Sequence, residues 1–295
     1  MMSVSTSRSR PDWPWLLFAA LLCTQLWAAH AAAFFLHEYA HSFVAWAAGW
    51  KANPFALNYA HPTLKVFLMQ MGINQNVDEG SIFASGHGPT AAIIAGAGMI
   101  VGNGLLSYPL SRLGYSVARK HDQRNWGLFS YWCTVASIGN FIDYVPVRTF
   151  TLEGDMGSIQ RGFGWSPWTV IVVLGIPIAA AMTYFFLKIE PASLTWLFPN
   201  SVPQRTIAVL VTGFVLFGFY GAAGLPEGAQ YRIEFPLFPY ACFYSSSPWH
   251  RGFLFKGVPL WRFRQISNVK RARYLSGQVS EKPVCWMFRL IRRYV

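Results

Sequence analysis

Five apolar stretches, each long enough to cross a membrane as a helix, dominate this sequence. They cover residues 13–48, 90–110, 126–147, 167–187 and 207–224. A helix needs about 20 mostly apolar residues to span the hydrocarbon core of a bilayer, where it satisfies its own backbone hydrogen bonds. The composition agrees, because 53% of the residues are hydrophobic and only 12% are charged. We therefore predict an all-α polytopic membrane protein with about five transmembrane helices, which excludes a soluble enzyme.

The polar segments divide the chain into three parts. Residues 1–12 are polar, residues 13–224 hold all five spans, and residues 225–295 form a basic C-terminal tail. The tail ends in mixed bulky apolar and basic residues, which is typical of an interfacial helix, and a disordered tail is the alternative. The layout predicts an integral, multi-pass protein, and we expect a bacterial-type plasma membrane.

The basic residues indicate both the partner and the topology. There are 24 Lys and Arg against 12 Asp and Glu, and the excess gathers at the N-terminus, in the predicted loop Arg112–Arg124 and in the tail. This placement suits anionic lipid in the bilayer, and no recognisable nucleic-acid module is present, so we expect no nucleic-acid partner. The positive-inside rule places the N-terminus and this loop in the cytoplasm. The end of the first span and the segment 140–155 then lie on the same side of the membrane.

Two features between the spans concern packing and substrate access. Residues 50–89 predict a short hairpin or a membrane-hugging loop, with a strand-like piece at 64–71, that could present substrate backbone to a site. In the second span, Gly98 and Gly102 form a G-x-x-x-G pattern. Such spacing allows another helix to approach closely, and we expect this contact within the fold.

The first span contains an H-E-x-x-H motif, formed by His37, Glu38 and His41. Residues four apart lie on one face of a helix, so the two imidazoles can bind one Zn²⁺. Glu38 is turned off that face and can take a proton from a metal-bound water. The alternative is that these side chains merely decorate a helix end. An ionisable cluster with apolar flanks is costly without a partner, which favours a functional site.

A hydrolytic zinc site needs a third protein ligand and one open position for water. The acidic candidates on the predicted side of the membrane are Asp143, Glu153 and Asp155, and His87 lies in a loop as a further candidate. Asp143 has two other possible roles, since it can pair with Arg148 or support a zinc-bound histidine from behind.

The motifs together resemble the site-two protease family of intramembrane zinc metalloproteases. The resemblance is carried by His37-Glu38-Tyr39-Ala40-His41, by Asn140 with Pro146, and by Gly154-Asp155-Met156-Gly157. It implies a metalloprotease-like domain over residues 13–224, with His37, His41 and Asp155 as zinc ligands and Glu38 as the general base. It also implies that Asn140 positions substrate backbone. Asp143 stays the alternative ligand, because it lies between Asn140 and Pro146.

The predicted function is hydrolysis of peptide bonds in membrane-associated protein or peptide substrates by a zinc-activated water. Two other functions have to be weighed. An inactive relative would keep the zinc and act through binding, but it would not need Glu38. A transporter of protons or metal ions would spread polar groups along a path through several spans, whereas here they gather at one level.

Overall fold

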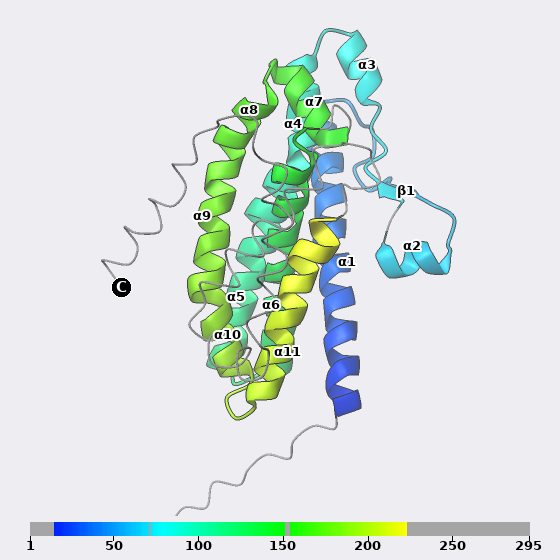
Figure 1. The fold of residues 1–295 in the computed structure, drawn as a ribbon. Helices are drawn as coiled ribbons and strands as arrows, with labels where there is room; N and C mark the ends of the chain where they lie inside the picture. The colour runs from blue at the N-terminus through cyan, green and yellow to red at the C-terminus, as the bar shows by residue number, and fades with distance from the viewer. Residues whose placement is uncertain (1–14, 71, 151–153, 223–295) are drawn as a thin grey trace, which may run out of the picture. The chain divides into compact units, whose positions relative to one another are not determined.

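A computed structural model of the chain describes residues 15–70, 72–150 and 154–222 (Figure 1). The predicted N-terminal segment 1–12 and the basic tail 225–295 lie outside these residues. The elements in chain order are α1 (Trp15–Ala47), β1 (Asn58–Tyr59), α2 (Leu64–Met69), β2 (Ile73–Asn74), α3 (Glu79–Ala84), α4 (Gly88–Ala97), η1 (Gly98–Ser107), α5 (Tyr108–Lys120), α6 (Arg124–Ile142), η2 (Asp143–Arg148), α7 (Gly154–Phe163), α8 (Pro167–Val170), η3 (Ile171–Gly175), α9 (Ile176–Tyr184), η4 (Phe185–Ile189), α10 (Glu190–Leu197), α11 (Val202–Gly213) and η5 (Phe214–Tyr220). The η segments are π-helical turns that continue the α-helices, except that the backbone of η2 is non-helical at Val145, before Pro146. The described chain is therefore mostly helical, as predicted.

Four of the described helices are long and apolar enough to cross a membrane, one fewer than predicted. They are Trp15–Ala47, Gly88–Lys120, Pro167–Leu197 and Val202–Tyr220. The segment predicted as a span at 126–147 is helical, as α6 and η2, but it is not among these four.

The four spans are distinguished by length and composition alone, so the reason lies in the polar residues of α6, which its central position explains. This helix contacts α1, α5, η1, η5, α9 and α10, so most of its surface is covered by other helices (Figure 1). Its apolar run is interrupted by Ser130, Thr134 and Ser137, which are all buried. Thr134 bonds Ser111 at 2.9 Å, and Ser137 bonds Ser107 at 2.7 Å. Small polar residues of this kind allow neighbouring helices to pack and bond closely, at the cost of hydropathy.

Two helix bounds differ from the prediction. The second long helix continues to Lys120, so most of the predicted basic loop Arg112–Arg124 is helical. The helix that begins at Pro167 continues to Leu197, ten residues beyond the predicted end at 187. In both cases the helix continues into the polar residues that follow the apolar run. The length of an apolar run does not determine where a helix ends.

The insertion between α1 and α4 contains the predicted hairpin. Strands β1 and β2 pair antiparallel, with Asn58 opposite Asn74 and Tyr59 opposite Ile73. The strand-like prediction for 64–71 was wrong, because residues 64–69 form α2. A short apolar run is ambiguous between strand and helix, and here Thr63 decides it. Its side chain caps the helix by accepting a hydrogen bond from the backbone N–H of Val66.

Two close helix contacts, both made by glycines, position the segments around the H-E-x-x-H motif. A Cβ added at Gly102 would lie 2.6 Å from the backbone oxygen of Leu36 on α1, so η1 and α1 touch at backbone level. The predicted role of the G-x-x-x-G pattern is thus confirmed. A Cβ at Gly162 would lie 2.2 Å from the backbone oxygen of Gly88, so α7 packs equally closely on α4. These contacts bring α1, η1, α4 and α7 together.

Candidate metal centre

His37 and His41 lie one turn apart on the face of α1 that packs against α4 and η1. Their side chains are 2% and 1% exposed, and their Nε2 atoms are 3.0 Å apart. Two imidazole nitrogens that point at one place, away from solvent, form the first half of a metal site.

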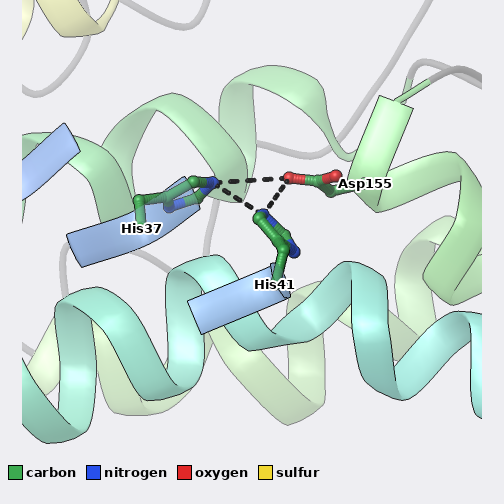
Figure 2. A group of neighbouring side chains, drawn as sticks. All are labelled: His37, His41 and Asp155. Carbon is green, nitrogen blue, oxygen red and sulfur yellow. Dashed lines mark hydrogen bonds and ion pairs between the residues drawn. The ribbon is translucent and has the colours of Figure 1, made fainter. Parts of the chain in front are cut away.

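Asp155 completes the cluster from a different part of the chain. It stands in the first turn of α7, directly after Gly154, whose φ of +63° lets the backbone turn into the helix. Its Oδ2 atom lies 3.5 Å from Nε2 of His37 and 3.4 Å from Nε2 of His41. Figure 2 shows the carboxylate pointing between the two rings.

The donor set fits a zinc ion in both chemistry and spacing. The three ligand atoms all lie within 4.8 Å of one another. Zinc bonds to nitrogen and oxygen are about 2.0–2.2 Å long, so the ligand atoms of a tetrahedral ion lie about 3.3–3.6 Å apart. The observed separations of 3.0, 3.4 and 3.5 Å are close to this range. Two neutral imidazoles with one carboxylate are also a familiar ligand set for hydrolytic zinc.

The surroundings hold Asp155 in its ionised form, which is the form that binds a metal. Burial alone raises the pKa of an aspartate, but the neighbouring His41 and His37 hold the pKa of Asp155 well below its ordinary value. The carboxylate is therefore available to a cation across the physiological pH range.

Each histidine also bonds through its second ring nitrogen. Nδ1 of His41 lies 2.7 Å from the backbone oxygen of Ile94. A carbonyl can only accept, so Nδ1 carries a proton, and Nε2 is the nitrogen left to bind a metal. Nδ1 of His37 lies 2.9 Å from the side-chain amide of Asn103, which is fully buried on η1.

Tyr144 is another neighbour of the cluster. Its hydroxyl lies 3.0 Å from Nε2 of His37, and the two rings stack with centroids 5.3 Å apart. Neither Asn103 nor Tyr144 was predicted from the sequence. For Asn103 a usable signal exists, since it is the one strongly polar side chain in its apolar span and directly follows the G-x-x-x-G pattern. Tyr144 gives no comparable signal.

Glu38 is buried next to the cluster but is not part of it. Its side chain is 7% exposed, and among the described residues its Oε2 atom has no hydrogen-bond partner. The Gln75 backbone, directly after β2, bonds the carboxyl group, and the charges of His41 and Asp155 act on it. The Glu38 carboxylate thus keeps one oxygen without a partner close to the candidate metal ligands.

The other predicted site residues lie outside the group of three. Asp143 accepts a hydrogen bond from Nε of Arg148 at 3.0 Å, which is one of the roles foreseen for it. The Asn140 amide donates to the backbone oxygen of Ala136 on its own helix. His87 contacts the Ser85 hydroxyl and the Trp50 ring. Glu153 lies outside the described residues.

No protein-family model, curated protein or solved structure matches the chain. The sequence motifs and the arrangement of His37, Glu38, His41 and Asp155 are therefore the basis for a proposed function.

Proposed function

We propose that this chain is a membrane-embedded zinc metallopeptidase similar to the site-two proteases. The observation that carries the proposal is the convergence of His37, His41 and Asp155 beside the free carboxylate oxygen of Glu38. Asp155 follows His37 by 118 residues (155 − 37), so local sequence spacing does not account for its position.

The three ligands and Glu38 would divide the chemistry between them. His37, His41 and Asp155 would hold the zinc, which lowers the pKa of a coordinated water towards neutrality and polarises a peptide carbonyl. Glu38 would accept a proton from the water that attacks the carbonyl, and would return this proton to the amine that leaves. A purely structural site has no use for this buried carboxylate, which favours an enzyme over an inactive relative.

The insertion between α1 and α4 is the proposed place for the substrate. A peptide bond inside a membrane helix is shielded by its own hydrogen bonds, so a substrate must be locally extended to be cleaved. The hairpin of β1 and β2 ends at Gln75, whose backbone contacts Glu38. An extended substrate segment could pair with this hairpin as an added strand and present its carbonyl to the site.

Membrane embedding is the second half of the proposal. Four described helices have the length and apolar character for it, and α1 carries both histidines. A site on such a helix suits substrates that are themselves membrane proteins or membrane-bound peptides.

The first experiment measures metal content in the purified full chain, in detergent after reconstitution with zinc. We expect about one zinc per chain for the wild type and for Asp143→Ala, and loss of zinc in His37→Ala and Asp155→Ala. Retention of zinc in Asp155→Ala with loss in Asp143→Ala would assign the third ligand to Asp143 instead. Absence of zinc from the wild type would refute the peptidase and favour a transporter.

The second experiment separates an enzyme from an inactive relative. The zinc-loaded wild type is incubated in detergent with an unfolded, dye-labelled protein, and Glu38→Gln is the matched variant because it keeps size and burial. We expect cleavage by the wild type, and in the variant a loss of at least about 100-fold with zinc content unchanged. Equal cleavage by both proteins would contradict the role of Glu38. Zinc binding without cleavage by either would favour a binding protein.

A further inference from the structure

Among the described residues, Asn103 is the only one whose side chain contacts Nδ1 of His37, the ring nitrogen that faces away from the metal site. One of the two polar atoms of the Asn103 amide has no partner. The Nδ2 group of Asn103 faces Nδ1 of His37 at 2.9 Å. Its Oδ1 atom is buried without any hydrogen-bond partner. A fully buried amide oxygen without a partner loses its hydration and gains no hydrogen bond in return, so the arrangement needs an explanation.

The chemistry of a zinc-bound His37 would explain why the Asn103 oxygen is placed there. If Nε2 gives its lone pair to a metal, Nδ1 carries the proton and must donate it. Two N–H groups facing each other would repel. A half-turn of the Asn103 amide exchanges nitrogen and oxygen at almost no change in shape. The Oδ1 atom then accepts a hydrogen bond from Nδ1–H of His37, which gives both of these atoms a partner.

We infer that Asn103 is a positioning residue for the metal site, which accepts the Nδ1 proton of His37 and aims Nε2 at the metal. Asn103 would accept the Nδ1 proton of His37 in the way that the Ile94 carbonyl accepts the Nδ1 proton of His41. Such outer partners fix the tautomer and the ring orientation of a ligating histidine. The inference depends on the proposed metal site, and it adds a residue that no motif in the sequence indicates.

The element that carries Asn103 explains how it can reach the ring. Asn103 follows Gly102, and η1 packs at backbone level against Leu36 and His37. Only at such a short helix separation does a short amide reach the far side of an imidazole on the neighbouring helix. The glycine that allows close packing and the asparagine that orients the ligand therefore act as one unit.

The test compares zinc affinity in the full chain, measured in detergent by competition with a chromophoric chelator. Asn103→Leu keeps the approximate volume but removes the acceptor, and we expect zinc binding 10–100-fold weaker than in the wild type. Asn103→Asp restores an acceptor oxygen, so its affinity should equal or exceed that of the wild type. Ser107→Ala is the matched control, because it removes a buried hydrogen bond from the same element, to Ser137, without touching His37.

The thermal unfolding of the metal-free proteins shows whether each variant folds. Wild-type affinity in Asn103→Leu would overturn the inference while leaving the proposed function intact. Equal losses in the Leu and Asp variants would also overturn it, because a packing defect alone predicts no rescue by Asp. Absence of zinc from the wild type would instead remove the metal site and the inference with it.

Discussion

Gly98 offers the sharpest test of where the metal lies. A Cβ added at this position would stand 2.2 Å from Nε2 of His41 and 2.4 Å from Nε2 of His37. Non-bonded heavy atoms are comfortable at about 3.5–4.0 Å, so the methyl group of Gly98→Ala would force each nitrogen to retreat by more than about 1 Å. The rings cannot retreat freely, because both are buried and both are bonded through Nδ1.

The expected effect on zinc binding is large. Metal–ligand distances tolerate only about ±0.2 Å, so we expect Gly98→Ala to weaken zinc binding by at least about 100-fold, or about 2.8 kcal/mol. Overpacking costs about 1–3 kcal/mol of stability, which the better helix propensity of alanine offsets by up to about 1 kcal/mol. The variant should therefore lose far more metal affinity than fold stability.

The assay is zinc stoichiometry with a competition titration, run beside Gly104→Ala. Gly104 lies on the same element, and an added Cβ there makes only ordinary contacts, the nearest at 3.5 Å. The control should bind zinc like the wild type. If Gly98→Ala also binds zinc like the wild type, the metal does not lie between these histidines and the geometric argument is wrong.

Two further predictions concern the fold around the site. Gly102→Ala would place a methyl group 2.6 Å from the backbone oxygen of Leu36, which cannot move without the whole helix. We expect a loss of about 1–3 kcal/mol in the free energy of unfolding, seen as a lower midpoint in thermal unfolding, and an unchanged midpoint would contradict the backbone contact. Glu79 gives a pH-dependent prediction. Burial raises its pKa, and the charge of Asp155 adds to this effect. An ionised Glu79 therefore costs stability above that raised pKa, so Glu79→Gln should unfold at a higher temperature than the wild type at pH 8. The difference should shrink as the pH falls towards 4, where the wild-type carboxyl is protonated as well. A difference that is equal at both pH values would exclude this explanation.

Local sequence patterns were enough to predict the features that depend only on neighbouring residues. The spacing of His37 and His41 determines their common face on any helix, and the G-x-x-x-G pattern needs only a neighbouring helix. Long apolar runs were likewise enough to predict most of the helices. The predicted number of spans was one too high, because α6 contains polar residues among its apolar ones. Its serines become favourable only when other helices supply their hydrogen-bond partners.

The remaining features depend on contacts between distant segments. Asp155 was one of three acidic candidates on the predicted side of the membrane, and only the resemblance favoured it over Asp143 and Glu153. Asn103 contacts His37 across 66 residues of sequence, and Tyr144 does so across 107. Tyr144 has no local signal in the sequence, and the polarity of Asn103 within its apolar span does not say which residue it contacts. The helix at 64–69 was missed for a different reason, since a single capping threonine decided between two structures that the apolar run allows equally.

The division of the site between α1 and α7 has a consequence for how the protein is made. His41 and Asp155 are 114 residues apart (155 − 41), and Asp155 reaches the histidines only when α7 packs on α4 through Gly162 and Gly88. A nascent chain that has inserted α1 but not yet synthesised α7 offers two ligands, too few to hold zinc tightly. For the proposed metallopeptidase, metal capture would therefore be a late step in biogenesis, and the enzyme would stay inactive until α7 is in place.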